Sequence, residues 1–172
     1  MTVKEAIIQC KEKINEKDIC LFSTGYISRY GFHHLRRNRN FYMVGSMGLL
    51  SSIGIGLALS TDSRIILFDG DGSFLMGLHT LPLIKLIGNK PFIHVVLNNR
   101  VYASTGGQDV PLISFSDAAR FYEDRYFVND LSAFYSKGPT LLVLNCDKEK
   151  EPCARVNLPC PTYYNLFKKE IK

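Results

Sequence analysis

The pattern of apolar and polar positions predicts strands that alternate with helices. Apolar runs followed by turn residues are typical of buried strands, and they occur at residues 19–23, 64–68, 91–97 and 139–145. A shorter run at 125–128 predicts a further strand. Helical spacing of apolar residues covers 3–16, 47–59, 74–87, 116–122, 130–137 and 162–171. Because wholly apolar strands that alternate with helices are typical of covered parallel sheets, we predict one α/β domain over residues 1–172, with helices on both faces of the sheet.

Local signals refine three of these segments. Thr2 and Glu5 are spaced as a capping box, and Ser116 is the expected cap of the helix that starts there. Residues 100–115 contain Gly106, Gly107 and Pro111, which predicts an irregular and functional loop. The helix over 47–59 is rich in small residues, so its backbone is expected to pack closely against another surface.

Composition is that of one globular domain. Hydrophobic residues make up 46% and charged residues 22% of the 172 residues. No apolar run approaches the roughly 18 residues that a membrane helix needs, and the charged N-terminus does not resemble a secretion signal. The five cysteines are odd in number and never spaced CxxC, which argues against a disulfide framework or zinc site. We therefore expect a cytoplasmic protein without a membrane partner.

The net charge of +5 is concentrated in the stretch Arg29–Arg39. This stretch holds four arginines and two histidines but no acidic residue, so it is either a solvated basic loop or a rim that attracts a phosphate or carboxylate. No nucleic-acid recognition motif accompanies it, and the pI near 8.9 is modest, so we expect no nucleic-acid partner.

Two polar clusters follow neighbouring strands. Gly70-Asp71-Gly72-Ser73 comes directly after one strand, and Asn98-Asn99 follows the next. Ligands of open α/β sheets lie beyond the carboxyl ends of the strands. The glycines leave N–H groups open toward an anion, and the carboxylate and amide oxygens suit Mg²⁺ or Ca²⁺, which often bridges to a phosphate.

With 25 residues between Gly72 and Asn98, the two clusters resemble the signature of the thiamine-diphosphate enzymes. The resemblance implies that Asp71, Asn99 and the main-chain carbonyl of Val101 hold Mg²⁺ on the diphosphate of the cofactor. It also implies that Gly70, Gly72 and Ser73 contact the phosphates.

Further motifs agree with this resemblance. Gly45-Ser46-Met47-Gly48 is similar to the family's G-x-M-G turn, in which an apolar side chain bends the cofactor; Gly45, Ser46 and Met47 are then cofactor contacts, with Met47 as the wedge. The expected loop 24–29 would place Ser28 and Arg29 against the diphosphate. The strings TGYISR, FYMVGSMG, FDGDGSFLM and LNN followed by STGGQ resemble the phosphonopyruvate and sulfopyruvate decarboxylases most. Tyr102 and the pair Tyr30-Gly31 depart from that subfamily near the mouth of the site, which leaves the anionic group of the substrate open.

The resemblance also implies a missing half. These enzymes need a second, pyrimidine-binding domain whose Glu activates the cofactor, and 172 residues have room only for the diphosphate domain. We therefore expect a partner subunit that supplies this Glu, in a hetero-oligomer such as α2β2. The small-residue helix over 47–59 and the loop 100–115 are the expected contact surfaces. Met1 at a capped helix and the closing helix favour a natural subunit.

The implied reaction is decarboxylation of a small anionic 2-oxo acid, 3-phosphonopyruvate or sulfopyruvate, to the aldehyde and CO₂. Arg29, with Arg36 or Arg37, is a candidate for binding its second anionic group. Three alternatives stay open: a carboligase of the acetolactate-synthase kind, a non-catalytic scaffold or regulatory relative, and a nucleic-acid-binding protein. His94, inside an apolar strand, is expected to be a core residue.

Overall fold

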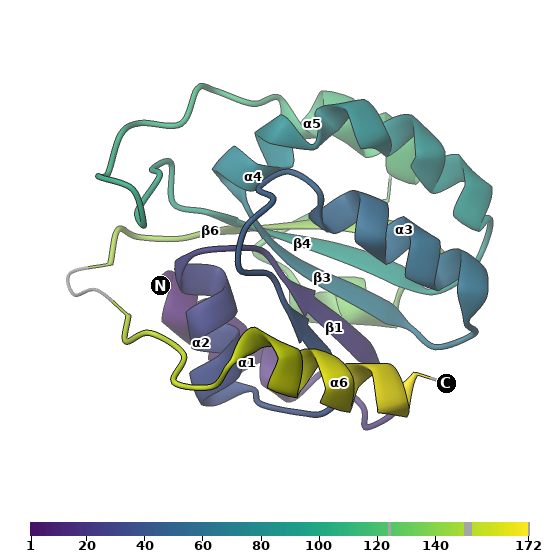
Figure 1. Ribbon diagram of the computed structural model, residues 1–172. Helices are drawn as coiled ribbons and strands as arrows, with labels where there is room; N and C mark the ends of the chain where they lie inside the picture. The colour runs from purple at the N-terminus through teal and green to yellow at the C-terminus, as the bar shows by residue number, and fades with distance from the viewer. Residues whose placement is uncertain (124, 150–152, 172) are drawn as a thin grey trace.

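The computed structural model describes residues 1–123, 125–149 and 153–171, and its centre is a parallel sheet (Figure 1). The sheet has six strands in the order β2-β1-β3-β4-β6-β5, and every neighbouring pair is parallel. The strands are β1 (Ile19–Phe22), β2 (Asn40–Tyr42), β3 (Ile65–Gly70), β4 (Phe92–Asn98), β5 (Tyr126–Val128) and β6 (Pro139–Asn145). The parallel sheet is therefore confirmed.

Helices connect the strands and cover both faces of the sheet (Figure 1). The α-helices are α1 (Val3–Lys11), α2 (Tyr26–His34), α3 (Leu50–Ser60), α4 (Asp71–Met76), α5 (Phe115–Ala118) and α6 (Cys160–Glu170). Three 3₁₀ segments complete the connections: η1 (Leu78–Ile87), η2 (Ala119–Tyr122) and η3 (Leu131–Tyr135).

Two hydrophobic cores lie on opposite faces of the sheet because successive strand residues point to opposite sides. Cys20 and Phe22 join the core under α1, α2 and η3, whereas Ile19 and Leu21 join the core under α3, η1 and η2. The α6 helix packs along β2 at the edge of the sheet, so it adds Tyr163 to the first core and Phe167 to the second. The strands are buried on both faces, which explains their uninterrupted apolar sequences.

The segment after β1 is not the loop that the sequence predicts. The chain turns at Gly25, which has φ +86°, and α2 begins at Tyr26. Gly31 lets this helix approach the sheet, since a Cβ there would lie 2.4 Å from the Phe22 ring. The basic stretch Arg29–Arg39 is therefore the end of a helix and the approach to β2, which the sequence did not predict, rather than a basic loop.

Several predicted helix boundaries also move. Ser114, not Ser116, caps α5, because the Ser114 hydroxyl accepts a hydrogen bond from the Asp117 N–H. The Thr2 capping box is confirmed, but α1 already ends at Lys11. The expected helix over 74–87 divides at Gly77, where α4 gives way to the 3₁₀ segment η1, and α3 starts only at Leu50.

The order of the strands creates a crevice at one edge of the sheet. From β1 the chain passes outward to β2 on one side, and it then returns to place β3 on the other side of β1. The connections after β1 and β3 therefore diverge at the carboxyl ends of these strands, which is the usual place for a ligand in an open α/β sheet. Within residues 1–123, 125–149 and 153–171, none of the helices could span a bilayer.

Candidate functional site

A cavity lies at this divergence, between the segments that follow β1, β3 and β4. Seven of the predicted site residues line it: Met47, Gly70, Asp71, Gly72, Ser73, Asn99 and Val101. The other four line neighbouring surfaces. Ser28 and Arg29 line an adjoining cavity, and Gly45 and Ser46 border an apolar groove beside α6.

Asp71 is the central acid of the cavity. It is the first residue of α4 and only 3% exposed. The Asp71 Oδ1 accepts a hydrogen bond from the Gly72 N–H (2.8 Å), and the Oδ2 accepts one from the Arg100 N–H (2.6 Å). Burial raises the pKa of Asp71, while the two N–H donors act in the opposite direction. The bond to Arg100 fixes the turn after β3 against the turn after β4.

The turn after β4 brings further oxygen atoms to the cavity. The Asn99 side-chain oxygen accepts a hydrogen bond from the Val101 N–H (3.2 Å), and Arg100 between them has φ +61°. The Tyr102 N–H donates to the Gln108 carbonyl (2.8 Å), and Val101 pairs with Asp109 in an antiparallel bridge. The loop 100–115 is thus irregular, as predicted, but its first half is a hydrogen-bonded turn.

Two close approaches explain the glycines of the motifs. A Cβ at Gly72 would lie 2.2 Å from the Tyr102 ring, so the ring packs directly on the turn. Gly48 has φ +88°, and its N–H donates to the buried Ser73 hydroxyl (3.2 Å). This bond ties the turn that carries Met47 to α4, and Met47 remains 36% exposed at the cavity.

Among the polar residues that line the cavity, Ser23 and Glu149 had no predicted role, whereas Tyr102 was expected near its mouth. The Ser23 hydroxyl lines it, is buried, and has no hydrogen-bond partner among the described residues. Tyr102 and Glu149 also line it, and the Glu149 Oε1 accepts a hydrogen bond from the Lys4 N–H (3.0 Å). Ser23 could have been found as the polar end of a buried strand, but nothing local points to Glu149.

A buried polar chain lies behind the cavity. The Oδ1 of Asp69 accepts the Gly70 N–H (3.0 Å), and its Oδ2 lies 3.3 Å from the His94 Nε2. The His94 Nδ1 is 2.7 Å from the Tyr122 hydroxyl. His94 is only 1% exposed, which confirms it as a core residue, and its partners explain how an apolar strand tolerates an imidazole.

The arginines of the basic stretch do not act together. Arg37 donates to the carbonyls of Asn15, Glu16 and Asp18, and the Arg36 guanidinium lies 4.8 Å from the centre of the Phe32 ring. Neither lines the cavity, so the expectation that they bind the substrate is wrong. Of the four arginines in this stretch, Arg29 is the one that lines a cavity at the carboxyl ends of the strands.

Comparison with known proteins decides the family. Residues 23–145 match the model described as "Thiamine pyrophosphate enzyme, C-terminal TPP binding domain". The chain belongs to this family. The matched segment contains all eleven predicted site residues. It starts at Ser23 in the cavity and ends at Asn145, the last residue of β6.

Curated relatives are similar over part of their length. Sulfopyruvate decarboxylase subunit beta of Methanocaldococcus jannaschii is 46% identical over 97 residues, which cover 56% of this chain and 52% of that protein. Phosphonopyruvate decarboxylase of Streptomyces viridochromogenes is 36% identical over 134 residues, which cover 71% of this chain and 34% of that protein. The chain therefore matches about half of the first relative and a third of the second.

Solved structures agree with the fold. The thiamine diphosphate-dependent 4-hydroxybenzoylformate decarboxylase of Rhodococcus jostii RHA1 superposes with a TM-score of 0.66 at 18% identity, over 88% of this chain and 33% of that one. Benzoylformate decarboxylase of Polynucleobacter necessarius gives the same TM-score at 18% identity, over 87% of this chain and 33% of that one.

Proposed function

We propose that this chain is the cofactor-binding subunit of a thiamine-diphosphate-dependent decarboxylase that acts on sulfopyruvate or 3-phosphonopyruvate. The observation that carries the proposal is the meeting of Asp71, Asn99 and Val101 in one cavity at the divergence of β1 and β3. The names of the relatives supply the substrate class.

The residues of the cavity fit a diphosphate held through Mg²⁺. A carboxylate, an amide oxygen and a main-chain carbonyl are hard donors of the kind that Mg²⁺ prefers, and Mg²⁺ is usually bound together with phosphate oxygens. Asp71, Asn99 and Val101 would hold the metal, and the Ser23 hydroxyl, which has no hydrogen-bond partner among the described residues, offers a further oxygen atom. No group of three or more His, Cys, Asp or Glu side chains suited to a metal occurs among the described residues, so the mixed donor set is the candidate.

The remaining predicted residues take supporting roles in this proposal. Gly70, Gly72 and Ser73 present the start of α4 to the phosphates, and Ser28 approaches from α2, whereas Arg29 lines the adjoining cavity. Gly45, Ser46 and Met47 form the turn under the ring system, with Met47 as the apolar wedge. When bound, thiamine diphosphate supplies an electron sink for the charge that remains as CO₂ leaves the 2-oxo acid. The residues of this chain bind and orient it.

We further propose that a partner subunit completes the site. The acid expected to activate the cofactor lies in a pyrimidine-binding domain, for which this single sheet has no counterpart among the described residues. The proposed enzyme is therefore a hetero-oligomer, and this chain contributes one of its two cofactor-binding domains.

Calorimetry of the chain with thiamine diphosphate, with and without Mg²⁺, tests the cofactor part of the proposal. We expect binding that depends on Mg²⁺. Asp71→Ala should weaken it by more than the roughly 10- to 100-fold that loss of a ligand's supporting hydrogen bond costs. Asp109→Ala is the matched control, because Asp109 is exposed in the neighbouring loop and should leave the affinity unchanged. Equal affinities for wild type and Asp71→Ala would contradict the proposal and favour a scaffold.

Product analysis tests the reaction. The chain is mixed with the protein encoded beside it, the cofactor, Mg²⁺ and either sulfopyruvate or 3-phosphonopyruvate. Aldehyde and CO₂ that form only in the mixture support a decarboxylase with a divided site. An acyloin product would instead identify a carboligase, and turnover by the chain alone would show that no partner is required.

A further inference from the structure

A second cavity adjoins the first on the side of α2 and the segment before α6. It has a volume of about 340 Å³, within the size range of small-molecule sites. Thr24 and Ser104 line both cavities, and Gly25 forms part of the wall between them, since a Cβ there would lie 2.7 Å from the Ser104 hydroxyl oxygen. The two cavities therefore lie side by side, with Gly25 and Ser104 between them.

The second cavity is cationic. Arg29 and Arg155 both line it, and no Asp or Glu is among its lining residues. These arginines come from distant parts of the chain, one from α2 and the other from the segment between β6 and α6. Neither forms a salt bridge with a carboxylate among the described residues. Two guanidinium groups beside one cavity, with no carboxylate partner among residues 1–123, 125–149 and 153–171, favour an anionic ligand.

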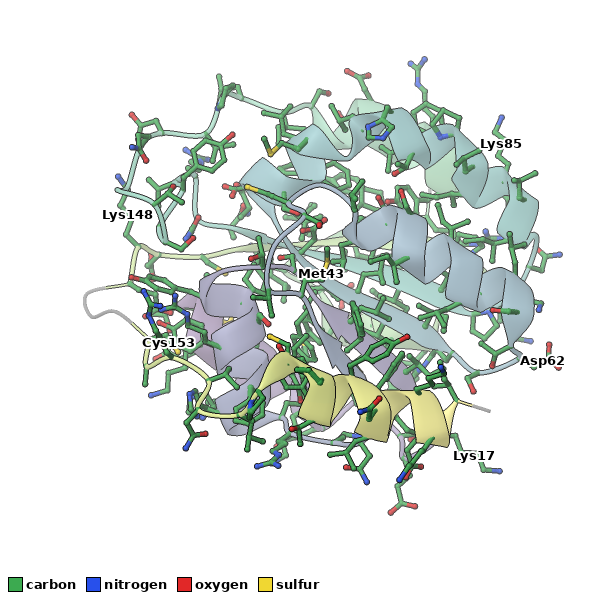
Figure 2. The ribbon with its side chains drawn as sticks, viewed as in Figure 1. Lys17, Met43, Asp62, Lys85, Lys148 and Cys153 are labelled. Atoms are coloured by element: carbon green, nitrogen blue, oxygen red, sulfur yellow. The ribbon has the colours of Figure 1, made fainter. Side chains whose placement is uncertain are left out.

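Arg29 is held in position by contacts that leave most of its donors available. Its Nη1 donates to the Cys153 carbonyl (3.0 Å), and its guanidinium lies 5.2 Å from the centre of the Tyr26 ring. A guanidinium has five N–H donors in a rigid plane, and pairs of them match the oxygen spacing of tetrahedral oxyanions. Figure 2 shows Cys153, whose carbonyl accepts this hydrogen bond from Arg29, on the same side of the molecule as Lys148. Lys148 lies just beyond the end of β6.

We infer that Arg29 and Arg155 bind the terminal tetrahedral anion, sulfonate or phosphonate, of the 2-oxo acid. The inference rests on the proposed function, under which the substrate is a 2-oxo acid that carries a second, tetrahedral anionic group. The terminal group keeps its charge while CO₂ leaves at the other end. Its binding therefore contributes equally before and during the reaction, so the arginines determine KM and substrate choice more than kcat.

Titration of the full chain with phosphonoacetate and sulfoacetate, followed by NMR, tests this inference. Both probes combine a carboxylate with a terminal tetrahedral anion, and acetate lacks the second group. We expect both to bind more tightly than acetate, and the tighter of the two to indicate which anion the cavity prefers. Arg155→Gln should weaken them roughly tenfold or more, as for loss of a charge-assisted hydrogen bond. Acetate should be unaffected.

Matched variants separate this site from the cofactor site. Arg36→Gln removes the same charge from an exposed arginine beyond the end of α2 and should leave the affinity for the probes unchanged. Arg155→Gln should leave the Mg²⁺-dependent affinity for thiamine diphosphate unchanged, whereas Asp71→Ala should show the reverse pattern. Because Arg155 is exposed, its replacement is not expected to disturb folding. Arg29→Gln provides an independent second test.

The outcomes are distinct. Wild-type affinity for the probes in both Arg29→Gln and Arg155→Gln would overturn the inference. Equal losses of probe and cofactor affinity in Arg155→Gln would also overturn it, because the cavity would then serve the diphosphate. If the wild type binds the probes through these arginines but never binds thiamine diphosphate, the proposed cofactor function fails while the anion site remains. In the active mixture, Arg155→Gln should raise KM at least tenfold with kcat little changed.

Discussion

Charged residues have opposite roles at the two ends of the strands, which we call the amino edge and the carboxyl edge of the sheet. At the amino ends of the strands, Arg64 pairs with Asp18 at 2.5 Å and donates to the carbonyls of Lys13 and Phe134. At the carboxyl ends, the donors to the side-chain oxygens of Asp71 and Asn99 among the described residues are main-chain N–H groups. Figure 2 shows the distance between the edges, with Lys17 and Asp62 on one side and Lys148 and Cys153 on the other.

This difference shows how one fold separates stability from binding. A guanidinium that satisfies carbonyls and a buried carboxylate holds several segments together, but it has little capacity left for a ligand. A carboxylate held only by main-chain N–H groups keeps its negative charge and lone pairs available to a cation. The amino edge is therefore expected to determine folding and the carboxyl edge to determine binding.

The largest expected effect is loss of the guanidinium at the amino edge. Arg64→Ala leaves the Asp18 carboxylate, whose side chain is 6% exposed, without its charged partner. Removal of one member of a buried pair typically costs about 3–5 kcal/mol, so we expect the free energy of unfolding in urea to fall by about that amount. Arg36→Ala is the matched control, because this exposed arginine lies over the Phe32 ring and forms no salt bridge among the described residues, so its loss should cost about 1 kcal/mol or less. Similar losses for both variants would remove the distinction between the edges.

A smaller effect is expected at the turn that carries Asp71. Gly72→Ala places a Cβ 2.2 Å from the Tyr102 ring, and such overpacking costs about 1–3 kcal/mol. The double variant with Tyr102→Ala should recover part of this loss, because the ring is then absent. Urea unfolding of the single and double variants measures the coupling between them.

Gly56→Ala provides the control for this cycle. A Cβ at Gly56 meets nothing within 4 Å, so the substitution inside α3 should stabilise the chain by about 0.5–1 kcal/mol. Strictly additive losses for Gly72→Ala and Tyr102→Ala would show that the ring does not pack on the turn.

The smallest effect concerns reactivity without a change in stability. Burial raises the pKa of Cys10 and Cys20 to about 12, and for Cys20 it outweighs the opposing influence of the Arg37 guanidinium. At pH 8 both groups are therefore protonated thiols, and their thiolate forms appear only as the pH approaches 12. Iodoacetamide at pH 8 should label the exposed Cys160 first and reach Cys10 and Cys20 only after unfolding, as mass spectrometry of the peptides would show. Labelling of Cys20 in the folded chain at the rate of Cys160 would contradict the buried assignment.

Local sequence patterns were sufficient wherever one residue type dominates a segment. The apolar runs of β3, β4 and β6 predicted the parallel sheet. The boundary after β3 was less accurate, because β3 extends to Gly70 and α4 begins at Asp71, where the sequence predicted a turn. The β2 strand escaped prediction because it has three residues and starts with Asn40, whose buried amide donates to the Leu35 carbonyl and the Tyr42 hydroxyl. No local pattern reveals such partners.

The residues of the candidate site also fall into those that the sequence predicts and those that only the fold brings together. The sequence by itself determined the family resemblance and the motif residues, because Asp71, Asn99 and the glycines are constrained by turns only a few residues long. Tertiary structure decided that Arg37 supports the fold while Arg29 adjoins the cavity, and it brought Arg155 and Glu149 to the carboxyl edge. The physical reason is that hydrogen bonds and charge pairing depend on distance in space, and residues more than a hundred positions apart become neighbours only when the sheet has formed.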